Sequence, residues 1–174
     1  MLNKLNKNPA AELTVLAIDP GYDRLGVAII KEVAGKSSLL FSDCIITDKK
    51  NTHDKRLAIA GLAIAKLIET WHPQVMAIEE LFFSKNQKTA LLVSQALGVI
   101  IYEASKAGLD VAYYKPVQVK VAVTGYGQSN KDQVTNMVTR LIKMEAKNRH
   151  DDEYDAIAVG LTHLACRHSN AAKR

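Results

Sequence analysis

The chain has 174 residues and a mass of 19.1 kDa, with 48% hydrophobic and 24% charged residues. This balance is typical of a globular protein, and the length favours one domain over two. The two cysteines, Cys44 and Cys166, are too few for a disulfide framework. The sequence also has no secretory leader and no apolar run of about 20 residues. We therefore expect a cytoplasmic protein that does not enter membranes.

The charge is unevenly distributed along the chain. In total, 23 Lys and Arg residues oppose 18 Asp and Glu residues, a net charge of +5. Residues 115–149 carry a local excess of basic side chains, and residues 151–155 (DDEYD) follow immediately with a cluster of acids. A basic tract beside an acidic cluster is typical of an enzyme that binds phosphates and holds metal ions next to them. The structural alternative is a solvated surface followed by an acidic helix start.

The first part of the chain predicts three strands joined by short turns. Residues 13–19 (LTVLAID) form an apolar, β-rich run that Pro20-Gly21 ends. Two further runs of this type follow at short spacing, residues 26–33 and 39–47. Hairpin-length connections predict an antiparallel meander in which the second strand runs opposite to the first.

The rest of the chain alternates helices and strands. The expected elements are a helix from Thr52 to about residue 71, strand 74–80, helix 89–106, strand 109–114, a short helix after Pro116, a helix capped by Ser129, and a last helix from 151 to 168. Connections of helical length between the later strands imply parallel pairing. We predict an α/β fold with a mixed five-stranded sheet and helices on both faces. Residues 13–168 would form a single domain between a flexible extension (1–12) and a tail (169–174).

Two acids end buried strands of this prediction. Asp19 follows the apolar run VLAI, and Glu79 follows VMAI. A charge at such a position is costly unless it meets water, a partner or a cation. If the two strands are neighbours, both carboxylates lie at the same edge of the sheet, where a Mg²⁺ or Mn²⁺ ion would relieve their repulsion.

A further group of acids begins the last helix. Asp152 and Asp155, three residues apart, project from the edge of its apolar side, and Asp151 with Asp155 fits nearly as well. Taken singly, each acid has a structural explanation as a turn former or a helix cap. Together with Asp19 and Glu79 they predict two cations roughly 3.5 to 4 Å apart that hydrolyse a phosphodiester of a nucleic acid.

Five motifs carry a family resemblance. They are AIDPG at 17–21, AIEE at 77–80, QALGV at 95–99, GYGQSNKDQV at 125–134 and DDEYDAIAVGLTH at 151–163. In this order they resemble the RuvC-type Holliday junction resolvases of the ribonuclease H-like superfamily. The resemblance implies a sheet of strand order 3-2-1-4-5 and a homodimer that binds four-way junction DNA. It also implies paired, symmetrical nicks that leave 5′-phosphate and 3′-hydroxyl ends during homologous recombination and DNA repair.

The resemblance assigns roles to individual residues. The catalytic and metal-binding acids would be Asp19, Glu79, Asp152 and Asp155, holding two Mg²⁺ ions that Mn²⁺ can replace. The DNA-binding residues would be Phe82, Lys120 and Lys131. A branch-migration complex of the RuvA/RuvB type is the implied protein partner.

Several points stay open at this stage. Phe82 and Phe83 both suit base stacking or the core, the two lysines also suit a solvated surface, and His150 or Asp151 would be close enough to assist a metal site. The segment Tyr22-Asp23-Arg24-Leu25 departs from the family, which commonly has a hydroxyl residue and a Thr there. The main alternative is another ribonuclease H-like nuclease, of the RNA-processing YqgF type. An actin-like kinase module would need a second lobe, and a junction-binding protein without activity would not need all four acids.

Overall fold

The computed structural model of the chain describes residues 12–81 and 87–171. Its elements follow the predicted order. They are β1 (Leu13–Asp19), β2 (Arg24–Val33), β3 (Lys36–Ile46), α1 (His53–Trp71), β4 (Val75–Glu79), α2 (Gln87–Lys106), β5 (Asp110–Tyr114), α3 (Pro116–Thr124), α4 (Lys131–Leu141) and α5 (Asp151–Ala171). The last helix is three residues longer than the sequence predicted.

The strands form one mixed sheet in the order β3-β2-β1-β4-β5, as predicted. β2 runs antiparallel to both β1 and β3, whereas β1, β4 and β5 are mutually parallel. The pairing of β2 with β3 shifts where Ile29 faces Phe41 but Ile30 faces Leu39, which leaves Leu40 as the extra residue of a β-bulge. The free edge of β3 is partly covered by the segment between α4 and α5, through a bridge of Ser38 with Lys143.

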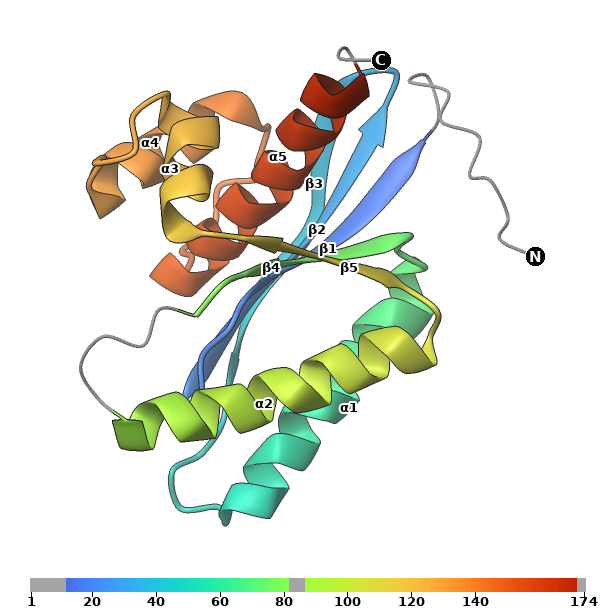
Figure 1. Cartoon of the computed structure of the whole chain (residues 1–174), viewed down its shortest axis with the longest axis vertical. Helices are drawn as coiled ribbons and strands as arrows, with labels where there is room; N and C mark the ends of the chain where they lie inside the picture. Colours follow the sequence, from blue (N-terminus) through green and yellow to red (C-terminus); the bar gives the residue numbers. More distant parts are fainter. Residues whose placement is uncertain (1–11, 82–86, 172–174) are drawn as a thin grey trace.

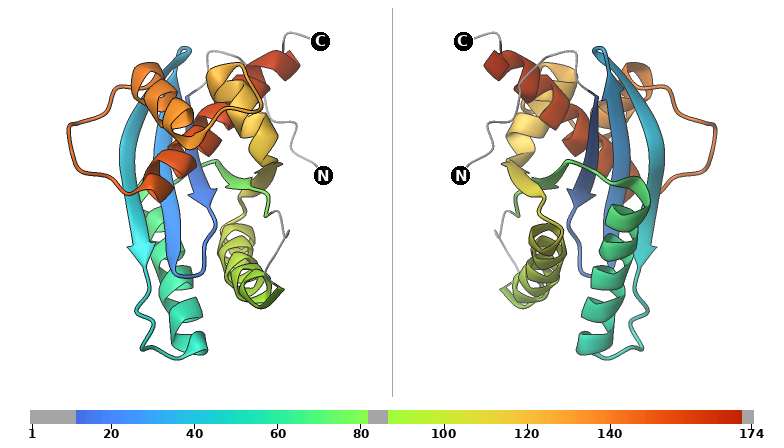
Figure 2. Two further views of the ribbon diagram at one scale, coloured as in Figure 1. Left: turned by 90° about the vertical axis from the view of Figure 1, so that its left-hand side faces the viewer. Right: turned by 90° about the vertical axis from the view of Figure 1, so that its right-hand side faces the viewer.

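Both faces of the sheet are buried, which explains why its central strands are continuously apolar. Alternate residues of β1 point to opposite faces. Val15 and Ala17 pack with α3, α4 and α5, whereas Leu16 and Ile18 pack with α1 and α2. Figures 1 and 2 show the two helical layers on either side of the sheet. In Figure 1 the carboxyl ends of β1 and β4 and the first turn of α5 lie together on the left.

The start of α4 differs by one residue from the prediction. Asn130, not Ser129, is the N-cap: its side chain accepts a hydrogen bond from the Gln133 backbone N–H (2.9 Å), and the Gln133 side chain accepts one from Asn130 N–H (2.9 Å). Ser129 is instead buried, with its hydroxyl 2.7 Å from the Thr124 hydroxyl. Lys131 consequently stands at the first position of the helix.

Two glycines let α5 lie directly on the sheet. A Cβ atom on Gly26 of β2 would lie 2.0 Å from the backbone oxygen of Asp152. Farther along α5, a Cβ on Gly160 would lie 2.7 Å from Ile30 Cδ1 and 3.1 Å from Ala17 Cβ. The close approach at Gly26 fixes the height of the first turn of α5, which carries the acidic cluster, above β2.

We therefore expect Gly26→Ala to lower the free energy of unfolding by about 1–3 kcal/mol, because the added methyl group meets rigid backbone. Gly98→Ala in α2 is the matched control: nothing lies within 4 Å of its Cβ position. There the substitution should be neutral or stabilise by up to about 1 kcal/mol. Urea denaturation of both variants measures the difference, and equal effects at the two positions would contradict the proposed close packing.

Candidate active site

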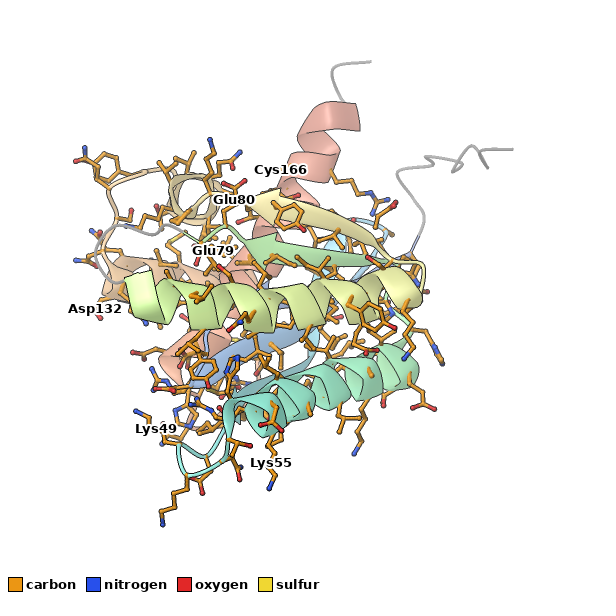
Figure 3. The ribbon with its side chains drawn as sticks, turned by 60° about the horizontal axis from the view of Figure 1, so that its bottom comes forward. Lys49, Lys55, Glu79, Glu80, Asp132 and Cys166 are labelled. Atoms are coloured by element: carbon orange, nitrogen blue, oxygen red, sulfur yellow. The ribbon has the colours of Figure 1, made fainter. Side chains whose placement is uncertain are left out.

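The register of the sheet brings the two strand-end acids together. Ile18 of β1 pairs with Ile78 of the parallel strand β4, so Asp19 and Glu79 follow at the same edge of neighbouring strands. Figure 3 shows Glu79 at the end of β4. The sequence-based expectation that these acids are neighbours is met because β1 and β4 are adjacent in the sheet.

These two carboxyl groups are half-buried and repel each other. Burial, followed by the charges of Asp155, Glu79 and Asp152 in that order, raises the pKa of Asp19 to about 8, although Lys131 opposes the shift. Burial and Asp155 also raise the pKa of Glu79 to about 7, although Lys120 and Lys131 oppose the shift. The two lysines therefore neutralise only part of the negative charge that these carboxylates carry when ionised.

The acids of α5 have different surroundings. Asp152 is 16% exposed and belongs to the groups that raise the pKa of Asp19, whereas Asp151 is 67% exposed and is turned to Lys131 at 3.5 Å. Asp155 lies one turn farther along the helix and raises the pKa of both Asp19 and Glu79. The rotation of α5 thus directs Asp152 and Asp155 to the strand ends, a choice that helical spacing alone left open.

Lys131 and Lys120 supply positive charge from the α3–α4 side. The ammonium group of Lys131 is 3.0 Å from Asp155 Oδ2. Burial opposes the charge on Lys131, but the contacts with Asp155 and Asp151 outweigh it and raise the pKa of the lysine. Lys120 in α3 acts on Glu79 through its charge. Both lysines of the sequence prediction therefore lie beside the acids.

Side chains from β2 and β3 reach Asp152. The guanidinium of Arg24, at the start of β2, is 3.1 Å from Asp152 Oδ2. Cys44 of β3 donates its S–H to the same oxygen at 3.7 Å. Burial, followed by the charge of Asp152, raises the pKa of the Cys44 thiol to about 11, so the sulfur keeps its proton. Asp152 is thus held in place from the sheet.

A buried glutamate anchors the start of α5. Glu153 accepts hydrogen bonds from the Ser42 hydroxyl (2.7 Å) and the His150 backbone N–H (3.1 Å), and Lys147 Nζ lies 3.0 Å away. Burial would raise the pKa of Glu153, but these donors outweigh it and lower the pKa. Lys147 also donates to the Ser42 carbonyl oxygen at 2.8 Å. This network fastens the first turn of α5 and the preceding segment to β3.

The loop after β1 is fixed by the buried side chain of Arg56. Its Nε donates to Thr47 Oγ1 (2.9 Å), its Nη2 donates to the Tyr22 carbonyl (3.1 Å), and the guanidinium stacks on the Tyr22 ring at 3.7 Å. Arg56 and then Lys49 lower the pKa of Asp23 through their hydrogen bonds. The segment that departs from the family pattern therefore has its own rigid support.

The remaining sequence candidates have mixed outcomes. Phe82 and Phe83 lie outside the described residues. His150 is exposed at the helix entrance, where its backbone binds Glu153. Three residues that contact the site or its supports, Arg24, Cys44 and Glu153, were not predicted from the sequence. The sequence signals that could have indicated them were the unusual segment 22–25, which contains Arg24, and the third acid of DDEYD, which is Glu153.

The cluster suits hard divalent cations, because its donors are carboxylate oxygens and its charge is incompletely neutralised. Among the described residues, no three acidic, histidine or cysteine side chains already stand as a closed set of metal ligands. Instead Asp152 faces Arg24 and Asp155 faces Lys131. Asp19, whose pKa is raised most, is the carboxylate for which a cation would matter most.

The fold and the site define the class of protein. A mixed sheet of this order, with acids at the ends of β1 and β4 and on the last helix, is a ribonuclease H-like architecture of the nuclease type. The family model "Crossover junction endodeoxyribonuclease RuvC" matches residues 15–163. The chain belongs to the RuvC family of crossover junction endodeoxyribonucleases, a family of metal-dependent nucleases.

The similarity to individual relatives supports this assignment. The chain is 46% identical to RuvC of Moorella thermoacetica over 88% of its own length and 92% of the relative's. It is 40% identical to RuvC of a Roseiflexus species, covering 85% of this chain and 88% of the other. The structure of Thermus thermophilus RuvC in complex with a Holliday junction substrate matches with a TM-score of 0.83 and 30% identity, covering 90% and 96% of the two chains. The yeast mitochondrial resolvase Ydc2 shares the fold, with a TM-score of 0.68 at 14% identity over 92% and 82% of the chains.

The raised pKa of Asp19 predicts a pH-dependent stability. A carboxyl whose pKa rises from 3.8 to about 8 on folding holds its proton better in the folded state, so its contribution to stability is present at low pH and is lost as the pH rises through about 8. Asp19→Asn removes this loss. In metal-free buffer the variant should therefore gain stability over the parent at pH 8 relative to pH 5, by on the order of a few kcal/mol.

Thermal melting across this pH range measures the effect. Added Mg²⁺ should raise the melting temperature of the parent more at pH 8 than at pH 6, because cation and proton compete for the same carboxylates. The Asp19→Asn variant should respond less. A stability difference between parent and variant that does not change with pH would contradict the assignment of the buried charge to Asp19.

Proposed function

We propose that this protein resolves Holliday junctions: it binds a four-way DNA junction and hydrolyses two phosphodiesters symmetrically, leaving 5′-phosphate and 3′-hydroxyl ends, in homologous recombination and DNA repair. The observation that supports the proposal is the electrostatic interaction of Asp19 with Glu79, Asp152 and Asp155 in a chain that belongs to the RuvC family. As a member of that family the protein is a crossover junction endodeoxyribonuclease.

The four carboxylates would hold two Mg²⁺ ions, for which Mn²⁺ can substitute. Bound cations of this kind activate a water molecule and stabilise the leaving oxygen of a phosphodiester. The protein's own contribution is to hold the acids close together against their repulsion. Asp19 and Glu79 are fixed by the sheet, and Asp152 and Asp155 are fixed by the packing of α5 at Gly26 and by the Glu153 network.

Lys120 and Lys131 are placed to receive the DNA backbone. Both lie beside the acids, and Lys131 stands at the first turn of α4, where backbone N–H groups add to its charge. We assign to them the binding of phosphate oxygens at the nick. Phe82, which follows β4 by three residues, is assigned to stacking on an unpaired base at the crossover by family resemblance.

Two symmetrical nicks call for two sites, so we propose a homodimer. Large apolar side chains are exposed on α1 and α2, among them Leu62, Leu91 and Tyr102. Covering them would favour self-association.

A branch-migration complex of the RuvA/RuvB type is the proposed protein partner, and the cytoplasm is the proposed location. None of the helices in the described part of the chain is long and apolar enough to cross a membrane.

The decisive experiment offers the purified protein, with Mg²⁺, three substrates: a four-way junction, a linear duplex of the same sequence, and a structured RNA. We expect paired nicks in opposite strands of the junction and little cutting of the duplex, with activity abolished by chelator and restored by Mg²⁺ or Mn²⁺. RNA cleavage equal to or better than junction cleavage would contradict the proposal and favour a YqgF-type RNA-processing nuclease.

The two neighbouring aspartates provide a matched test of the site. Asp152→Asn should reduce junction cleavage by more than about 100-fold, beyond the loss typical of residues that only support metal ligands. Asp151→Asn should change it by less than about fivefold, because its exposed pair with Lys131 is worth little. Gel assays of cleavage and of junction binding measure both variants. Normal cleavage by Asp152→Asn, or the reverse ranking, would transfer the metal-binding role to Asp151.

A further inference from the structure

We propose, building on the function proposed above, that Arg24 binds a backbone phosphate of the DNA strand beside the carboxylate cluster. It would add a basic contact from β2 to those of Lys120 in α3 and Lys131 in α4.

The side chain of Arg24 is available for this contact. It is 48% exposed, although its guanidinium reaches Asp152 Oδ2 at 3.1 Å. A guanidinium carries five N–H donors in a planar fork, so a single carboxylate oxygen leaves most of them free for the oxygens of a phosphate. Asp152 in turn has a second partner in Cys44, so its position does not rest on Arg24 alone.

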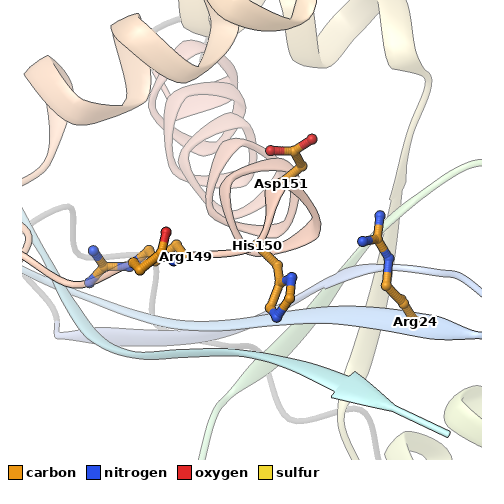
Figure 4. A pocket seen from close by; sticks show the side chains of 5 residues that line it. Arg24, Arg149, His150 and Asp151 are labelled. Carbon is orange, nitrogen blue, oxygen red and sulfur yellow. The ribbon is translucent and has the colours of Figure 1, made fainter. Parts of the chain in front are cut away.

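Arg24 also forms one wall of a pocket next to the acids. The pocket has a volume of about 250 Å³ and is lined by Arg24, Asn148, Arg149, His150 and Asp151. Figure 4 shows Arg24 and Arg149 on opposite sides of His150. The side chain of Arg149 is only 6% exposed, with its donors turned to the Ser42 hydroxyl and the Glu145 carbonyl. Of the two arginines that line this pocket, Arg24 is therefore the one that can meet a ligand.

The backbone of Arg24 is held in place before any ligand arrives. The adjacent Asp23 carboxylate is bound by Arg56 and by Lys49 at 3.0 Å, so it does not compete for the Arg24 guanidinium. The Tyr22 ring is stacked against Arg56, and its hydroxyl lies 2.8 Å from His53 Nδ1. Binding would consequently order only one side chain, which keeps the entropic cost low.

The present partner of Arg24 explains how it would be released. Asp152 is one of the proposed cation ligands. A carboxylate that coordinates a cation attracts an arginine less strongly, because the cation neutralises part of its charge. Arg24 would then face the incoming strand with its charge unpaired. The phosphate contact is therefore expected in the presence of Mg²⁺, and the test is made under that condition.

The test measures junction binding in the Glu79→Gln background, chosen to prevent cleavage, with Mg²⁺ present and salt varied from about 50 to 200 mM. Arg24→Gln should flatten the slope of log affinity against log salt by about 0.9 for each protomer, and weaken binding about tenfold at the lowest salt. Arg24→Lys, which keeps the charge, should keep the slope. The control is Lys36→Gln, an exposed charge at the β2–β3 hairpin, at the opposite end of β2 from Arg24, which should leave slope and affinity unchanged.

A second measurement identifies the phosphate itself. Replacing single phosphates near the nick by neutral methylphosphonates should, at one position, abolish the difference in affinity between the parent and Arg24→Gln. Thermal melting establishes that the variants are folded. An unchanged salt slope for Arg24→Gln, or the absence of any such position, would overturn the proposal even if cleavage slows, because Arg24 would then only hold Asp152.

Failure of the proposed function has a different signature. A parent protein that does not prefer the four-way junction to duplex contradicts that function, whatever Arg24 does. A parent that prefers and nicks the junction, with an Arg24→Gln variant of unchanged salt slope, contradicts only the role of Arg24.

Discussion

The mutual repulsion of half-buried carboxylates at the carboxyl edge of the sheet is the constraint around which this structure is organised. Asp19 and Glu79 cannot separate because they continue two hydrogen-bonded neighbouring strands. Asp155 adds its charge from α5 and raises the pKa of both. Such an arrangement costs stability when no cation is bound, and it persists because apolar packing on both faces of the sheet outweighs that cost. The same repulsion is what makes the cluster receptive to divalent cations.

The helix that delivers the second pair of acids is fixed by contacts that have no part in the chemistry. Gly26 allows the backbone of Asp152 to touch β2, and Glu153 fastens the same turn to Ser42 of β3. These two anchors flank Asp152, so a small displacement at either would move a carboxylate relative to Asp19. The position of the Asp152 carboxylate relative to Asp19 therefore depends on Gly26 and on the buried Glu153.

Much of this could be predicted from the sequence, and the exceptions share a physical cause. The strand-end acids follow from an apolar run that ends in a charge, and the sheet order followed from the family motifs. Helical spacing could not choose between Asp151 and Asp152, because the rotation of α5 is set by its contact with Gly26. The roles of Cys44 and Glu153 could not be predicted, because their partners Asp152 and Ser42 lie 108 and 111 residues away in the sequence. At α4, two adjacent residues were both good caps, and Asn130 took the role because the Ser129 hydroxyl is used by the preceding turn.

The segment between α4 and α5 has an effect on the whole molecule that is separate from catalysis. An outer strand offers unpaired backbone groups to any other extended chain, which is a route to aggregation. Here Lys143 bridges to Ser38, Lys147 donates to the carbonyl of Ser42, and the bulge at Leu40 interrupts the regular ladder of β3. Lys147 therefore has two effects: it supports Glu153, and together with the Lys143 bridge and the bulge it makes β3 a poor template for sheet extension.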